Sequence, residues 1–191
     1  DLKIVSIYTN EFDEKGPLLN WWKELSFEWQ SIFQQKLNIT DSIDLGDIKN
    51  ISSIESLDLS GNQYITNIEP LAQLSSLQVL SLANTSVTDL SPIRNLTELV
   101  ELDLSNTNLQ DISPLKYSDK LTKLKLSRTS VVDISVLERM TRLEHLDLSE
   151  TSVTDFNVLS NQVALKYLNL EATQVANLSP IDSLISLTEV N

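Results

Sequence analysis

The chain has 191 residues, of which 41% are hydrophobic, so its length and composition suit a folded domain with a buried core. Its 27 acidic and 14 basic residues give a net charge of -13, which disfavours nucleic acid and anionic lipid as partners because both require a basic face. It has no cysteine and no apolar run of the roughly 20 residues that cross a bilayer, which excludes a disulfide framework, a thiolate metal site and membrane insertion.

Residues 1–42 precede a repeated pattern and hold all three tryptophans, Trp21, Trp22 and Trp29. From Ser26 onward the apolar residues have the spacing of an amphipathic helix, with Ser26 as the predicted N-cap. The apolar residues between Pro17 and Leu25 predict a shorter helix before it. Since the first coil of a repeat array exposes an apolar end, we interpret this segment as an N-terminal helical cap. The alternative is that the tryptophans line a partner site.

A repeat then runs through the rest of the chain. Leucine or isoleucine recurs at an interval of 23 and then 22 residues, at Ile54, Leu77, Leu99, Leu121, Leu143, Leu165 and Leu187. From each of these positions the pattern is L-x-x-L-x-L, and its last three residues predict a short strand with one face in the core and the other in solvent. We interpret the apolar residues from Ile43 to Ile51 as an incomplete first coil.

The second half of each repeat has an apolar spacing of three, as in Val87, Leu90 and Ile93, which predicts a 3₁₀ or short helical return arm. Ser91-Pro92 stands where a return arm would begin, and Ser-Pro recurs at residues 113–114 and 179–180. A serine before a proline is typical of the start of a helical turn, so we expect these hydroxyls to act as caps.

Two polar columns accompany the leucines. The first consists of Asp89, Asp111, Asp133, Asp155 and Asn177, and the second of Thr85, Thr107, Thr129, Thr151 and Thr173. We expect each acid to accept backbone hydrogen bonds in its own turn. A calcium ladder is the alternative, but no further ligands cluster with these acids, so we predict no metal. We expect the threonines to bridge backbone groups of adjacent coils.

This pattern resembles the 22-residue bacterial leucine-rich repeats of the internalins. The residues that carry the resemblance in one repeat are Leu77, Leu80, Leu82, Thr85, Val87, Asp89, Leu90 and Ile93. The resemblance covers residues 43–191 and implies an α/β fold, a leucine-rich-repeat solenoid of about six repeats, with a curved parallel β-sheet and short return arms. It also implies a concave β-face that recognises a protein, and exposure on a bacterial surface. Threonine stands in five repeats where internalins usually carry asparagine.

Side chains between the core leucines would face the concave surface, where equivalent positions of successive strands form columns. The residues that we predict to bind a protein partner are Glu101, Asp103, Lys123, Lys125, Arg128, His145, Asp147 and Tyr167. Tyrosine and arginine are frequent anchors of interfaces, which favours a binding module without catalytic activity. The alternative is a self-compensated, solvated surface, because Lys125 would lie between Asp103 and Asp147.

Other functions have less support. A hydrolase would use His145, the only histidine, with Asp147 and Ser149, but no nucleophile motif surrounds them, and we predict no enzyme. Three glycines provide no phosphate-binding loop, and we predict no cofactor. Carbohydrate binding would have only Tyr167 for stacking. A structural spacer, or one domain of a larger surface protein, is the main alternative to a binding module.

The two ends lead to expectations about location and assembly. The chain begins with Asp1, so an export signal or anchor could precede it, and we expect an extracellular or cell-surface location, with the cytoplasm as the alternative. The seventh predicted strand stops at Asn191 without a closing helix. We expect a truncated or short C-terminus in a monomer rather than a dimer paired through this strand edge.

Overall fold

The computed structural model describes residues 16–40 and 42–191, and it divides the chain into two compact units, Asp1–Ile54 and Glu55–Asn191. Residues 1–15 and 41, which belong to the predicted cap, lie outside the described residues. Among the described residues, no helix has both the length and the apolarity that a membrane span requires.

The first unit is helical, as predicted. Residues 16–24 form one helix, and α2 (Phe27–Lys36) follows it. The N-cap prediction is confirmed, because the Ser26 hydroxyl oxygen accepts a hydrogen bond from the Trp29 amide at 3.5 Å. Phe33 is the centre of an aromatic cluster, with its ring centroid 5.9 Å from that of Trp21 and 5.5 Å from that of Trp29. Trp21 and Trp29 therefore both pack on Phe33.

The segment that we interpreted as an incomplete first coil is helical. It forms a short α-helix, α3 (Leu45–Ile51). Its start is a capping box: the Asp44 carboxylate accepts from the Asp47 amide, and the Asp47 carboxylate accepts from the Asp44 amide, each at 2.9 Å. Reciprocal capping satisfies two backbone donors and favours an α-helix at this point.

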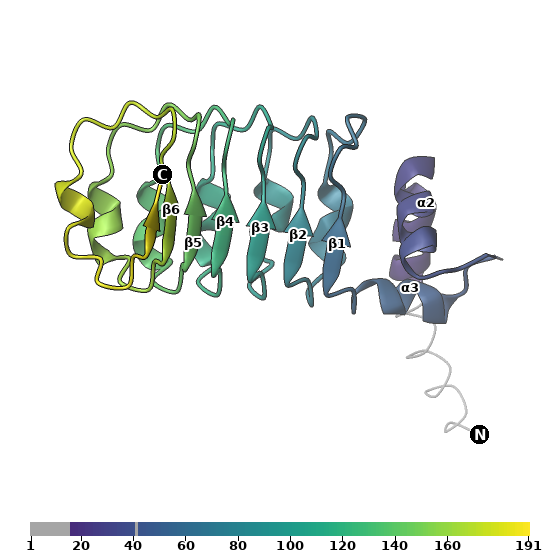
Figure 1. The fold of residues 1–191 in the computed structure, drawn as a ribbon. Helices are drawn as coiled ribbons and strands as arrows, with labels where there is room; N and C mark the ends of the chain where they lie inside the picture. Colours follow the sequence, from purple (N-terminus) through teal and green to yellow (C-terminus); the bar gives the residue numbers. More distant parts are fainter. Residues whose placement is uncertain (1–15, 41) are drawn as a thin grey trace, which may run out of the picture. The chain divides into compact units, whose positions relative to one another are not determined.

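The second unit contains one parallel sheet of seven strands in sequence order. The strands are β1 (Ser56–Asp58), β2 (Val79–Ser81), β3 (Glu101–Asp103), β4 (Lys123–Lys125), β5 (His145–Asp147), β6 (Tyr167–Asn169) and β7 (Glu189–Val190). They lie side by side and point the same way (Figure 1). The central leucines pair from strand to strand, as Leu102 does with Leu124 and Leu124 with Leu146, so the predicted register is confirmed.

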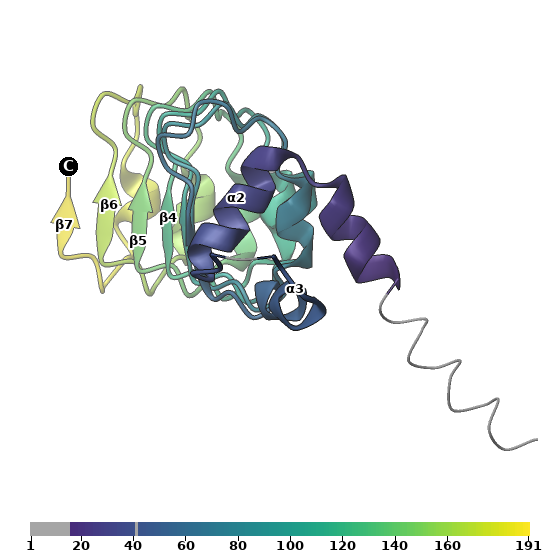
Figure 2. The ribbon, with the colours of Figure 1, turned by 90° about the vertical axis from the view of Figure 1, so that its right-hand side faces the viewer.

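A 3₁₀ helix follows each of the first six strands, which confirms the predicted return arms. They are η1 (Glu69–Gln73), η2 (Ser91–Ile93), η3 (Ser113–Tyr117), η4 (Ser135–Arg139), η5 (Asn157–Asn161) and η6 (Ser179–Ile181). Figure 2 shows the strands along one side of the solenoid and the helical turns along the opposite side. Stacked leucines fill the space between them, and Leu99, Leu121 and Leu143 have no exposed surface. Neighbouring coils thus complete one another's core.

The acidic column has the role predicted for it. Each carboxylate or amide oxygen accepts a hydrogen bond from the backbone N–H two residues later, as Asp89 does from Ser91 at 2.8 Å. Bonds of the same kind join Asp111 to Ser113, Asp133 to Ser135, Asp155 to Asn157 and Asn177 to Ser179. The bond from the Ser91 amide also holds the pKa of Asp89 below its usual value. By contrast, the predicted serine caps are wrong: no side chain caps η2, η3 or η6, because each serine is the first residue of its helix and the N-cap position before it is held by leucine or isoleucine.

The threonine column also differs from the prediction. Each hydroxyl donates to the carbonyl three residues earlier in its own coil, as Thr129 does to Leu126 at 2.7 Å. The same bond occurs at Thr85, Thr107, Thr151 and Thr173. Adjacent coils are joined there by backbone bonds instead, such as Arg128 N–H to the Ser149 carbonyl at 3.0 Å. A threonine hydroxyl is short and reaches its own turn first.

A further column of residues stands at the turn after each strand with a left-handed backbone. Its members are Gly61, Asn84, Asn106, Arg128, Glu150 and Ala172, with φ between 54° and 75°. Glycine adopts this conformation freely and asparagine tolerates it, but a Cβ atom strains alanine there. The turn therefore requires a positive φ in every coil, although only one coil has glycine.

Replacing Ala172 by glycine should raise the free energy of unfolding by about 0.5–1 kcal/mol, because the relieved strain exceeds the added entropy of the unfolded chain. Ala172 is exposed, so no packing is lost. The reverse change, Gly61→Ala, should lower stability by a similar amount, since the added Cβ would meet nothing within 4 Å and only the backbone would be strained. Urea unfolding measures both changes. If both variants shifted the free energy of unfolding in the same direction, backbone strain at these positions would not explain the result.

Candidate functional site

The polar residues between the core leucines form two columns on the solvent side of the sheet, which we call the strand face. The first column is Ser56, Val79, Glu101, Lys123, His145, Tyr167 and Glu189, and the second is Asp58, Ser81, Asp103, Lys125, Asp147 and Asn169. Cα pairing in the sheet matches both columns as predicted from the 22-residue interval. Seven of the eight predicted binding residues belong to these columns, and Arg128 lies in the turn after β4.

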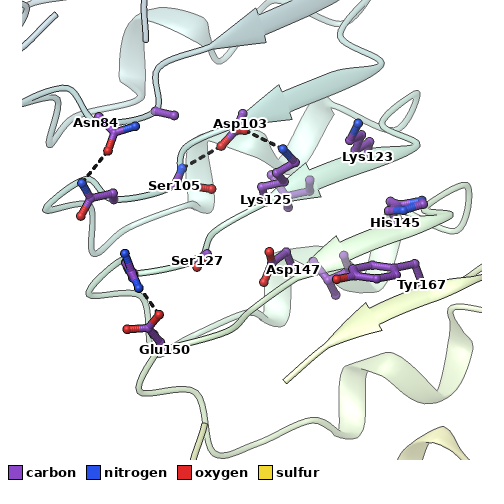
Figure 3. A pocket seen from close by; sticks show the side chains of 15 residues that line it. Asn84, Asp103, Ser105, Lys123, Lys125, Ser127, His145, Asp147, Glu150 and Tyr167 are labelled. Carbon is purple, nitrogen blue, oxygen red and sulfur yellow. Dashed lines mark hydrogen bonds and ion pairs between the residues drawn. The ribbon is translucent and has the colours of Figure 1, made fainter. Parts of the chain in front are cut away.

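An open hollow of about 640 Å³ lies on the strand face between β3 and β6. Seven of the eight predicted residues line it. They are Arg128 and the six labelled in Figure 3: Asp103, Lys123, Lys125, His145, Asp147 and Tyr167. Glu101, the eighth, lines a smaller neighbouring depression with Lys123 and Lys125. The repeat interval thus brought together residues that are far apart in sequence.

The hollow has an aromatic side. The ring centroids of His145 and Tyr167 are 4.7 Å apart and the ring planes differ by 15°, so the rings are stacked. Their adjacent strands, β5 and β6, place these side chains at equivalent positions. The Tyr167 hydroxyl is 3.4 Å from the Asn191 amide nitrogen, which donates to it. The stack offers a partner a flat, partly polar contact with little freedom to lose.

The acids of the second column accept hydrogen bonds from the backbone of their own turns. Asp103 and Asp147 each accept the N–H of the residue two positions later, at 3.0 Å, and thereby close the turn after their strands. Lys125 occupies the same position in β4 and instead contacts Asp103, at 3.0 Å between Nζ and Oδ2. Partial burial alone would raise the pKa of Asp103, but hydrogen bonds from Ser105 and the Lys125 charge outweigh it, and its pKa is lowered.

Residues of the left-handed turn column also line the hollow, and of these only Arg128 is among the predicted binding residues. The Asn106 side-chain amide donates to the Asn84 side-chain oxygen at 2.7 Å, and Arg128 Nε lies 2.7 Å from a Glu150 carboxylate oxygen. Asn84, Asn106 and Glu150 could have been found from the sequence, because they stand directly before the threonine column.

The geometry of the described residues does not contain the serine–histidine–aspartate hydrogen bonds that the hydrolase hypothesis requires. The Ser149 hydroxyl donates to Asp147 at 2.7 Å and lies 2.9 Å from the Ser127 hydroxyl. Within the described part of the chain, His145 has no hydrogen bond to either Ser149 or Asp147, and its ring stacks on Tyr167 instead. No group of three or more potential metal ligands occurs among the described residues. The side chains can support recognition by stacking, charge and hydrogen bonds.

Known proteins were compared with the chain at the levels of sequence and structure. The family model described as Leucine Rich repeats (2 copies) matches residues 75–117. No curated protein matches the sequence. A structural relative is internalin C2 of Listeria monocytogenes, with 30% identity, a TM-score of 0.73, and coverage of 78% of this chain and 65% of that one.

Two further structures share the fold. An internalin of Listeria monocytogenes, InlF, has 27% identity and a TM-score of 0.66, with coverage of 78% of this chain and 50% of that one. A leucine-rich-repeat protein of Leptospira interrogans has 22% identity and a TM-score of 0.68, with coverage of 78% and 40%. The chain therefore spans between two fifths and two thirds of these proteins. The repeat interval, the parallel register and these similarities show that the chain has a leucine-rich-repeat fold similar to that of the internalins.

Proposed function

We propose that the chain is a non-catalytic module that recognises a protein through the hollow of its strand face. The observation that carries the proposal is the convergence of Lys123, Arg128 and the stacked His145–Tyr167 pair on one open surface. Leucine-rich repeats are commonly used for protein interaction, and extended surfaces of stacked repeats are suited to it. We further propose that the protein is exported and acts on a bacterial surface, as the internalin similarity suggests.

A spacer within a larger surface protein is the second candidate, and ion pairing on the strand face favours it. Lys123 lies 3.5 Å from Glu101, and Lys125 and Arg128 also have acidic partners. Exposed pairs of this kind contribute about 0–1 kcal/mol each and leave the surface nearly neutral and solvated. A partner would have to compete with these internal partners for the cations.

A capture experiment distinguishes these candidates. The wild-type chain should retain a protein from surface extracts of the source organism and its surroundings, and the triple variant Lys123→Glu, Arg128→Glu, Tyr167→Ala should lose it by roughly tenfold or more. Isothermal titration with the purified protein then measures the loss. Circular dichroism must show that wild type and variant fold alike.

The matched control is Lys36→Glu, Lys49→Glu, Tyr64→Ala, which makes the same kinds of change at exposed residues of α2, α3 and the turn after β1 that line neither the strand-face hollow nor the return arms. Retention by this control and loss by the strand-face variant would support recognition through the hollow. Equal retention by all three chains would move the binding surface elsewhere, and no retained protein would favour the spacer.

A further inference from the structure

A second surface of the solenoid, on the return arms, gathers positive charge around an exposed tyrosine. Tyr117 is the last residue of η3 and is 47% exposed. The Lys116 ammonium lies 4.7 Å from the centroid of its ring. Arg94 directly follows η2, and Arg139 is the last residue of η4, so three successive coils each contribute one cation. We call Arg94, Lys116, Tyr117 and Arg139 the return-arm cluster.

These three cations differ from those of the strand face in their lack of counterions. Lys123, Lys125 and Arg128 each contact a carboxylate. No described residue forms an ion pair with any cation of the return-arm cluster, in a chain whose net charge is -13. These charges also act on the tyrosine: a hydrogen bond and charge from Lys116, together with the charges of Arg94 and Arg139, lower the pKa of the Tyr117 hydroxyl.

The cluster also borders a recess. An open hollow of about 580 Å³ is lined by Lys116, Tyr117 and Arg139 together with Lys120 and two acids, Glu98 and Asp119. Glu98 is already held by Lys120, at 2.6 Å between carboxylate oxygen and Nζ. The remaining cations of the lining outnumber the remaining acid, and the tyrosine gives the recess an aromatic wall.

We propose that the return-arm cluster is a docking site for an acidic, extended segment of a partner protein. Parallel strands stand about 4.8 Å apart, so cations from the first and third of three coils are spread over roughly 10 Å, which about three extended residues span. Carboxylates along such a segment would pair with cations that have no internal partner, while Tyr117 supplies the contact area that interfaces favour. The overall charge of -13 opposes a nucleic acid, which needs a broad basic face.

The test uses the full chain and a fluorescein-labelled oligo-glutamate peptide, with binding followed by fluorescence anisotropy at low ionic strength. Wild type should bind the peptide, and Arg94→Glu, Arg139→Glu should weaken binding by roughly tenfold or more. The control Lys123→Glu, Arg128→Glu, which changes the charge equally on the strand face, should weaken it less than about threefold. Tyr117→Ala separately tests the aromatic contact and should weaken binding without changing net charge.

Three results would overturn the proposal. One is the absence of peptide binding by wild type, and another is equal weakening by the two double variants, which would indicate attraction to the whole molecule only. The third is self-association in sedimentation experiments that the Arg94→Glu, Arg139→Glu variant abolishes, because the occupant would then be a second copy of the chain. Inorganic phosphate, added at the same total concentration of negative charge as the peptide, should displace it poorly because phosphate presents no extended row of carboxylates.

Discussion

Replacing Leu124 by alanine should lower the free energy of unfolding by about 2–5 kcal/mol, a large part of the stability of a chain this size. Leu124 is the central residue of β4, the middle strand, and has no exposed surface. It pairs with Leu102 on one side and Leu146 on the other, so the cavity would weaken two interfaces between coils. Urea unfolding followed by circular dichroism measures the change.

The matched control for this variant is Val190→Ala. Val190 stands at the same repeat position in β7 and pairs with Leu168, but 46% of its surface is exposed. Its truncation should cost less than about 1 kcal/mol, because little apolar area is removed from the core. If both variants lost the same stability, repeat position rather than burial in a stacked core would determine the cost, and the argument for Leu124 would fail.

Most of the solenoid could be predicted because the regular spacing of its apolar residues indicates where the strands and return arms lie. The 22-residue spacing of leucines determined the strand register, and the spacing of three predicted the 3₁₀ return arms. The hydrogen bonds of small polar residues were harder to predict. Ser91 was predicted to cap a helix but is the first residue of that helix, and the Thr129 hydroxyl was predicted to bridge coils but donates within its own turn. Several acceptors compete within one turn, and sequence alone does not rank their distances.

In the candidate site, too, residue positions could be predicted from the repeat interval but side-chain partners could not. Column positions brought Lys123, His145 and Tyr167 together correctly, because a parallel sheet converts a sequence interval into adjacency. The ion pair of Arg128 could not be predicted from the sequence. Its partner Glu150 belongs to the next coil, and their contact depends on the left-handed backbone of both residues. The return-arm cluster escaped the sequence analysis because its members occupy two different positions of the repeat.

Two buried polar side chains, Ser118 and Gln162, break the apolar rule of the core at one repeat position. Gln162 stands at the repeat position that Leu96, Met140 and Leu184 occupy in other coils, and it has no exposed surface. Its amide nitrogen donates to the Leu137 carbonyl at 2.7 Å. Its side-chain oxygen Oε1 is buried and accepts no hydrogen bond from the described residues. A buried acceptor without a donor costs about 1–3 kcal/mol.

Gln162→Met should therefore raise the free energy of unfolding by about 1–2 kcal/mol: methionine nearly matches the volume of glutamine and removes the unpaired oxygen. Loss of the amide donor is tolerable, because the Leu137 carbonyl keeps its bond from the Met140 amide at 2.9 Å. The reciprocal variant Met140→Gln would bury an amide one coil earlier and should be destabilising by about 1–3 kcal/mol. Urea unfolding of both variants provides the measurement. A Gln162→Met chain less stable than wild type would mean that the glutamine is satisfied in the folded core and contributes to the stacking of coils.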